Sequence, residues 1–252
     1  PRRGVRRASL PVCPAALQKR ASSCAMPVAA PNRAPASRHI PRNIHVSSID
    51  ALPSVFLLFK EVFILDLQTL QQECLACRRC GLCESRTHVV FGQGVPDAEV
   101  LFVGEGPGTN EDAQGLPFVG RSGQLLDHYL EAVDLSRDKN VYIANVVKCR
   151  PPQNRDPLPE EASACLPWLR QQFQLLRPKI VVCLGRIAAQ QMIGPHFAIS
   201  RDHGKFFDKR GTLFMATYHP AALLRSPVNK PAVFGDFVAL REKIAQVCEH
   251  TY

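Results

Sequence analysis

Two kinds of apolar pattern follow one another in a regular order over the C-terminal part of this 252-residue chain. Short, nearly continuous apolar runs predict buried strands, and longer segments with apolar positions three and four residues apart predict helices. The predicted strands cover residues 99–103, 141–147, 179–184 and 211–218. The predicted helices cover residues 124–133, 159–176, 186–192 and 234–247, and a short helix begins near Ile64 and runs toward the first cysteines.

This order predicts the fold class. Nearly continuous apolar strands that alternate with helices indicate a parallel sheet covered on both faces. We therefore expect an α/β three-layer sandwich with a central, mainly four-stranded parallel sheet flanked by helices. In such sheets the functional site lies at the carboxyl ends of the strands. Three of those ends carry distinctive sequence, and we expect them to converge: GEGPG at 104–108, Asn145, and His219 before Pro220.

The basic charge of the chain is concentrated at its beginning. Residues 1–49 hold nine Lys and Arg residues and no Asp or Glu, which accounts for the whole formal net charge of +9. Rich in Ala, Pro and Ser, residues 1–60 are expected to form a disordered tail, either a targeting segment for an organelle or translated upstream sequence. Residues 61–252 are expected to form the folded domain, whose nucleic-acid contacts must depend on local patches.

Neither a membrane span nor a disulfide framework is expected. The apolar segment 55–65 is eleven residues long and contains Lys60 and Glu61, whereas a span needs about 20 apolar residues. The ten cysteines are partly clustered at metal-ligand spacing in a chain without a clear secretory signal. We expect a reducing, cytoplasmic environment.

The cysteine spacing predicts a metal site. Four cysteines follow one another with two residues between each pair, and two more lie far along the chain: Cys74, Cys77, Cys80 and Cys83, then Cys149 and Cys165. Four thiolates suit either zinc or an iron-sulfur cluster. The run lacks the last spacing and the proline of a bacterial ferredoxin motif. Spacing alone therefore leaves both metals open.

Several motifs in a fixed order resemble the family 4 uracil-DNA glycosylases over about residues 70–240. They are Cys77-x2-Cys80, VFGQG at 90–94, VGEGPG at 103–108, PFVG at 117–120, ANVVKCRPP at 144–152 and HPA at 219–221. The resemblance implies a [4Fe-4S] cluster held by Cys77, Cys80, Cys149 and Cys165. It also implies a monofunctional DNA-repair enzyme, because Lys209-Arg210-Gly211 does not match the basic insert of relatives that cross-link to the abasic site.

The resemblance assigns the base-binding residues. Asn145 offers an amide that matches O4 and N3–H of uracil, and Phe118 can stack on the extruded ring. His219 is placed to donate to uracil O2, while the backbone of Gly104, Glu105 and Gly106 adds to an anion-stabilising hole. Each has a plainer interpretation: Phe118 as core, Asn145 as a partner of backbone groups, and His219 as a strand end.

The group that positions water is less well defined by the sequence. Where the best-known uracil glycosylases have an Asp, this chain has Gly106. The nearby carboxylates are Glu105 and Glu111, of which the family resemblance favours Glu111. Both are retained as catalytic candidates.

Two proline-containing segments are expected to be loops that grip DNA, namely 150–155 and 219–225. Arg150, Arg155 and Arg225 can meet phosphates, and Leu223 or Leu224 can enter the duplex as an apolar wedge. The expected partner is uracil-containing DNA, single- or double-stranded, bound by a monomer.

Other functions have weaker support. The GEGPG turn lacks the spacing of a dinucleotide-binding loop, and GLPFVGRS at 115–122 has Arg121 where a P-loop needs Lys. Two alternatives stay open: a superfamily member with another deaminated-base preference, and a non-catalytic metal-bearing DNA-binding module.

Overall fold

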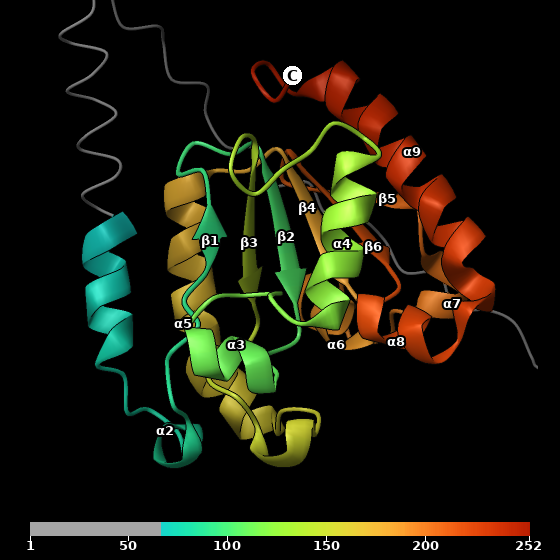
Figure 1. The fold of residues 1–252 in the computed structure, drawn as a ribbon. Helices are drawn as coiled ribbons and strands as arrows, with labels where there is room; N and C mark the ends of the chain where they lie inside the picture. Colours follow the sequence, from blue (N-terminus) through green and yellow to red (C-terminus); the bar gives the residue numbers. More distant parts are fainter. Residues whose placement is uncertain (1–66) are drawn as a thin grey trace, which may run out of the picture. The chain divides into compact units, whose positions relative to one another are not determined.

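The computed structural model describes residues 67–252 (Figure 1). The expected tail at 1–60 and the apolar segment 55–65 lie outside the described residues. Residues 67–75 are helical, as the spacing of Leu67, Leu70 and Leu75 predicts. Among the helices of residues 67–252, none combines the length and apolar character needed to cross a membrane.

The four predicted strands are confirmed as the parallel centre of one sheet. They are β2 (Val100–Gly104), β3 (Val141–Asn145), β4 (Ile180–Leu184) and β6 (Thr212–Thr217). The sheet has six strands, in the order β1-β3-β2-β4-β6-β5. The additional β1 (Gln93–Gly94) and β5 (Phe206–Lys209) pair antiparallel at the two edges. Their residues are partly or fully exposed, so neither shows the apolar pattern that predicts a buried strand.

Helices lie on both sides of the sheet (Figure 1). Alternate residues of each strand point to opposite faces and so meet different helix layers. Phe102 belongs to a core that includes side chains of α4 (Arg121–Glu131) and α9 (Lys230–Val247). Its neighbour Val103 belongs to the core formed with α5 (Pro159–Leu176) and α6 (Arg186–Met192). Both faces of the central strands are therefore buried, and the three-layer α/β architecture is confirmed.

Helix boundaries agree with the prediction where an apolar stripe defines them and differ elsewhere. Helices α5 and α6 match, whereas α4 begins three residues early at Arg121 and α9 begins at Lys230. The short elements were not predicted: α2 (Leu82–Ser85), α3 (Thr109–Gln114), η1 (Pro152–Asn154), α7 (Ile199–Asp202), α8 (Pro220–Arg225) and η2 (Pro227–Asn229). They are too short for a periodic pattern to develop.

One expected loop is a helix. Residues 219–225 were expected to form a DNA-gripping loop, yet residues Pro220–Arg225 form α8. Proline suits the first helical position because its missing N–H has no partner there, and the His219 side chain accepts a hydrogen bond from the backbone N–H of Ala221. The expectation of a loop was wrong because these start signals outweigh the proline.

The parallel register brings the distinctive strand ends together at one edge of the sheet. Gly104 at the end of β2 is paired with Asn145 at the end of β3, and Thr217 ends β6 beside Leu184 of β4. His219 lies two residues past the end of β6. The predicted convergence of these strand ends is confirmed.

Candidate functional site

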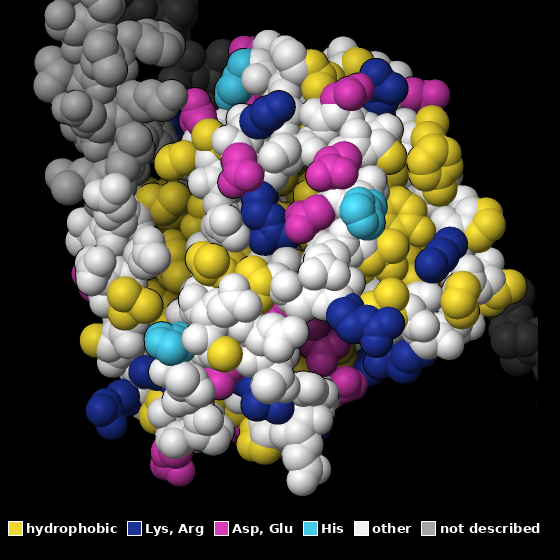
Figure 2. Space-filling view, in the orientation of Figure 1, with side chains coloured by type: hydrophobic (Ala, Val, Ile, Leu, Met, Phe, Trp, Pro, Cys, Tyr) yellow, Lys and Arg dark blue, Asp and Glu magenta, His cyan; other side chains and the backbone are white. Residues whose placement is uncertain are grey.

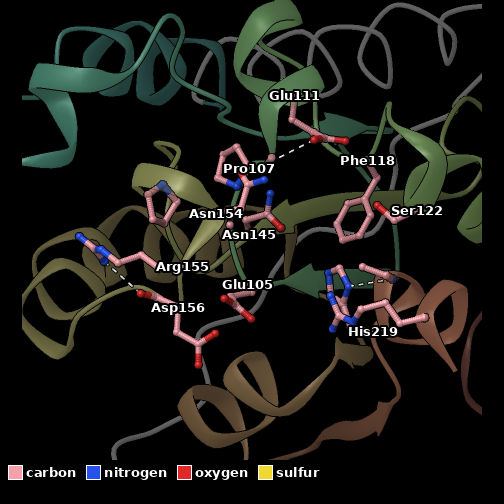
Figure 3. Close-up of a pocket in the computed structure, with 15 residues that line it drawn as sticks. Glu105, Pro107, Glu111, Phe118, Ser122, Asn145, Asn154, Arg155, Asp156 and His219 are labelled. Carbon is pink, nitrogen blue, oxygen red and sulfur yellow. Dashed lines mark hydrogen bonds between the residues drawn. The ribbon is translucent and has the colours of Figure 1, made fainter.

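A cavity of about 340 Å³ opens at the carboxyl ends of the strands. In the lower part of Figure 2, where the central strands end, acidic side chains are recessed between basic ones. The close-up shows Phe118, Asn145 and His219 pointing toward a common space (Figure 3). The cavity is large enough for a planar heterocycle and its sugar. Its polar and charged side chains are those of Glu105, Glu111, Ser122, Asn145, Asn154, Arg155, Asp156, His219 and Arg225.

Asn145 lines this cavity and carries an unpaired acceptor. The residue is 1% exposed, and its side-chain oxygen Oδ1 is the buried side-chain atom without a hydrogen-bond partner among residues 67–252. Its backbone carbonyl, in contrast, accepts from Lys148 Nζ at 3.0 Å. Leaving a buried acceptor unpaired costs about 1–3 kcal/mol, and a ligand N–H that donates to Oδ1 would remove this cost.

Phe118 forms another wall of the cavity. It is 5% exposed, and its ring centroid lies 5.6 Å from that of His219 at a tilt of 33°. Gly104 makes room for both Phe118 and Asn145. A Cβ at position 104 would lie 2.5 Å from Phe118 Cζ and 2.3 Å from Asn145 Oδ1. The first glycine of the GEGPG turn is therefore needed for the shape of the cavity.

His219 is held as a neutral imidazole. Burial and the charge of Arg225 together lower the pKa of His219 to about 4, against the opposing charge of Glu111. Nδ1 accepts a hydrogen bond from the backbone N–H of Ala221 at 3.1 Å, so the ring proton resides on Nε2. The residue thus offers one N–H donor without a full positive charge.

Glu111 is engaged by backbone groups on both sides of its carboxylate. Oε1 accepts from the N–H groups of Val119 at 3.0 Å and Gly120 at 2.8 Å, while Oε2 accepts from the N–H of Gly108 at 3.1 Å. These bonds join the GEGPG turn to the loop before α4. Glu111 lines the cavity but has an evident role in holding its walls.

Glu105 lies beside a second carboxyl group, that of Asp156 (Figure 3). Burial, together with the charge of Asp156 and a hydrogen bond with it, raises the pKa of Glu105 to about 7 against the opposing charges of Arg186 and Arg225. Asp156 itself forms an ion pair with Arg186 at 2.5 Å. Sequence reasoning missed Asp156, although an acidic residue in an otherwise basic, proline-rich segment was an available signal.

The residues expected to contact DNA differ in availability. Arg155 forms a bidentate ion pair with Glu161 at 2.6 and 2.8 Å, so its guanidinium is already occupied. Arg150 hydrogen-bonds through Nε to Asn154, and Arg225 lines the cavity. Leu223 is 1% exposed in the core, while Leu224 is 39% exposed. Of these two leucines on α8, only Leu224 is therefore exposed at the surface.

Six cysteines surround a second, smaller cavity beside the sheet. They are the four of the closely spaced run and the two distant ones: Cys74, Cys77, Cys80, Cys83, Cys149 and Cys165. Within residues 67–252, no three His, Cys, Asp or Glu side chains are grouped to hold one metal ion. A four-iron cluster takes one thiolate at each iron, so its ligands do not converge on a single point.

Four of these six sulfurs receive an N–H donor. Trp168 Nε1 donates to Cys77 at 3.3 Å, Arg86 Nη1 to Cys149 at 3.2 Å and the backbone N–H of Lys148 to Cys165 at 3.2 Å. The backbone N–H of Leu82 donates to Cys80. Within the described part of the chain, no such donor reaches Cys74 or Cys83. The four cysteines whose sulfurs accept a hydrogen bond are the same four that the family resemblance implies as ligands.

Comparisons with known proteins agree with one another. Residues 91–240 match the model of the family described as the uracil DNA glycosylase superfamily. A type-4 uracil-DNA glycosylase from Sulfurisphaera tokodaii is 42% identical over 70% of this chain and 84% of its own length. One from Archaeoglobus fulgidus is 42% identical over 72% of this chain and 93% of its own. A type-5 uracil-DNA glycosylase from Thermus thermophilus is 29% identical over 62% of this chain and 87% of its own.

Proposed function

Because the chain belongs to the uracil-DNA glycosylase superfamily, among its type 4 members, we propose that it hydrolyses the N-glycosidic bond of uracil in DNA and leaves an abasic site. The observation that carries this proposal is the unpaired Oδ1 of Asn145 at the wall of the strand-end cavity. Uracil presents an N–H next to a carbonyl oxygen, which is the complement of an amide side chain.

Recognition requires the base to leave the duplex, because its reactive bond is otherwise inaccessible. In the cavity, Asn145 Oδ1 accepts from uracil N3–H and Nδ2 donates to O4. Cytosine would present a donor at the position of O4 and lacks the N3 proton, so the same amide would face two mismatches. The ring of Phe118 stacks on the base.

Bond cleavage leaves negative charge on the uracil ring. The Nε2–H of His219 donates to O2, where this charge develops, and the backbone N–H groups of the GEGPG turn add to its stabilisation. A neutral donor suits this task, since the imidazole keeps its proton while the charge forms. The cavity thereby stabilises the departing base more than the intact nucleotide.

The water that attacks the sugar needs an acceptor for its proton. Glu105 suits this role better than Glu111, because a carboxylate whose pKa lies near 7 is an effective base at neutral pH. Glu111 has three backbone hydrogen bonds that hold the cavity walls. We assign water positioning to Glu105 and wall positioning to Glu111.

This assignment predicts a pH dependence. The ionised form of Glu105 accepts the proton, so the single-turnover rate should rise as the pH passes through about 7. Asp156→Asn removes a neighbouring negative charge, lowers the pKa of Glu105 and should move this limb to lower pH. Glu105→Gln should abolish the limb. A rate profile measured from about pH 5 to 9 checks this, and an unmoved limb in Asp156→Asn would contradict the pairing.

Uracil release from synthetic oligonucleotides tests the function itself. Single- and double-stranded DNA with one uracil is incubated with the protein and then treated with alkali, which cleaves abasic sites. Cleavage at uracil, with none at thymine or cytosine in matched strands, is expected. A His219→Ala preparation controls for contaminating glycosylases. Absence of abasic sites in both strand forms would refute the enzyme, and cleavage at hypoxanthine or xanthine alone would indicate the other base preference.

The six-cysteine cavity is proposed to hold a [4Fe-4S] cluster through Cys77, Cys80, Cys149 and Cys165. The N–H donors to these four sulfurs support this, since hydrogen bonds to sulfur stabilise thiolate ligands. The group would tie residues 77–80 to the segments that begin at Lys148 and contain α5. In this role it would hold in place the segment 150–155, which is proposed to face the DNA.

A cysteine series distinguishes ligands from bystanders. Cys165→Ala should lose bound iron and the visible absorbance of the anaerobically prepared protein, and its melting temperature should fall because the cluster no longer ties these segments together. Cys83→Ala, a matched change in the same cavity, should retain iron. Iron retained in Cys165→Ala, or zinc in place of iron in the unaltered protein, would contradict the proposed ligand set.

The DNA partner is proposed to lie across the mouth of the cavity. Arg150 and Arg225 would contact phosphates and Leu224 would fill the position that the base vacates. The proposed place of action is a reducing compartment, because the clustered cysteines are proposed as metal ligands and not as a disulfide framework.

A further inference from the structure

Arg137 has a guanidinium whose five N–H groups are all engaged. Nε and Nη2 donate to Asp127 Oδ1 at 3.1 and 2.7 Å, and Nη1 donates to Gln93 Oε1 at 3.1 Å. The remaining bonds run to backbone carbonyls, from Nη1 to Pro117 at 2.8 Å and from Nη2 to Phe118 at 3.0 Å. The side chain is 10% exposed and does not line the strand-end cavity.

The loop that Arg137 contacts is strained at the residue facing the cavity. Phe118 has φ of +52°, in the left-handed region that bulky residues rarely adopt without support from their surroundings. The backbone of this loop also lies tight against α4, since a Cβ at Gly123 would lie 1.8 Å from the Phe118 carbonyl oxygen. The conformation needs external support to persist.

Two opposite charges supply that support. The carbonyl oxygens of Pro117 and Phe118 accept from the Arg137 guanidinium, and the N–H groups of the next two residues donate to the Glu111 carboxylate. Each charged group matches the polarity of the backbone groups it meets. The four-residue loop 117–120 is thus held by a cation at its first half and an anion at its second.

We propose that Arg137 is a positioning residue for base recognition, which acts through the backbone of Phe118 to keep its ring against the extruded uracil. The proposal rests on the function proposed above, because it assigns Phe118 to the base. Arg137 touches neither base nor sugar. A lysine cannot replace it fully, because an ammonium cannot span two carbonyls, an amide and a carboxylate in one plane.

A plainer interpretation would make Arg137 an ordinary ion-pair partner of Asp127. The two interpretations differ in what a variant should lose. An ion pair alone contributes to stability and leaves ligand affinity unchanged, whereas a positioning residue changes affinity for the base specifically. Arg241 provides the matched control. It forms an ion pair with Asp134, with 2.7 Å between Nη2 and Oδ2, and neither residue belongs to loop 117–120.

The experiment measures binding of free uracil to the full-length protein by ligand-observed NMR, and binding of DNA with a stable abasic analogue by fluorescence anisotropy. Arg137→Gln should weaken uracil binding roughly tenfold, within the range that loss of base–aromatic stacking causes, and leave abasic-DNA affinity within about twofold. Arg137→Lys should be intermediate. Arg241→Gln should alter neither affinity.

A double-mutant cycle then tests the route of action. In a Phe118→Ala background, Arg137→Gln should have no further effect on uracil affinity, because the ring that it positions is gone. An equal effect in both backgrounds would overturn the proposal, as would unchanged uracil affinity in both Arg137 variants. If the unaltered protein binds no uracil and releases none from DNA, the proposed function fails first and takes this inference with it.

Discussion

Replacing His219 with alanine is expected to lower the single-turnover rate of uracil release by about 10²- to 10³-fold, the usual loss when one donor to a developing anion is removed. The charged side chains that line the cavity are three carboxylates, Arg225, and Arg155, which is already paired with Glu161, so none is an evident substitute for the Nε2–H. Rapid-quench measurement of uracil release, with enzyme in excess over DNA, isolates the chemical step from product release.

The exposed His128 gives a matched control, because its side chain is 76% exposed on α4 and pairs with Glu131. His128→Ala should keep the full rate. A His219→Ala variant that stays within tenfold of the unaltered enzyme would show that the backbone donors of the GEGPG turn carry the anion alone.

The lowered pKa of His219 also has a consequence for folding. The folded-state pKa of about 4 lies below the ordinary value of 6.5, so the neutral ring favours the folded state. This contribution is present above about pH 6.5 and is lost as the pH falls toward 4, where the unfolded chain binds the proton more readily.

Adding a single methyl group at Gly104 should damage activity almost as much as removing a functional group. In Gly104→Ala the new Cβ would overlap Asn145 Oδ1 and the Phe118 ring, so both must move away from the base. Displacements near 1 Å commonly cost about 10²-fold in rate, and we expect kcat/KM to fall by this factor. Steady-state kinetics with a uracil-containing strand measure the loss.

Gly194→Ala is the matched control, because a Cβ there meets no atom within 4 Å. It should leave kcat/KM and the melting temperature unchanged. Normal kcat/KM in Gly104→Ala would mean that neither Asn145 nor Phe118 needs its present position.

The sequence predicted the elements that have a repeating apolar pattern or are buried on both faces. The parallel strands read as apolar runs because both of their faces are covered, and the convergence of Gly104, Asn145 and His219 follows from parallel topology. The edge strands β1 and β5 escaped prediction because they are short and half exposed. The pairing register of neighbouring strands could not be predicted either, because the apolar pattern indicates only which residues are buried.

Contacts between side chains and distant backbone were the other gap. Arg137 looks like a surface residue in sequence, and nothing near it reveals that its guanidinium reaches Pro117 and Phe118. Glu111 was recognised as a carboxylate near the site, but its three N–H partners come from two loops whose conformation the sequence does not encode locally. The orientation of Leu223 depended on α8, which was expected to be a loop.

The strand order has a consequence for how the enzyme comes into being during synthesis. β6 pairs with β4, and β4 pairs with β2. His219 therefore comes near Asn145 only after the chain has formed two long crossover connections. Such non-local pairings form late and slowly. A nascent chain that has completed β2 and β3 already contains Asn145 and Phe118, yet it lacks His219, the donor proposed for the departing base. The proposed active site is therefore complete only when the last parallel strand has joined the sheet.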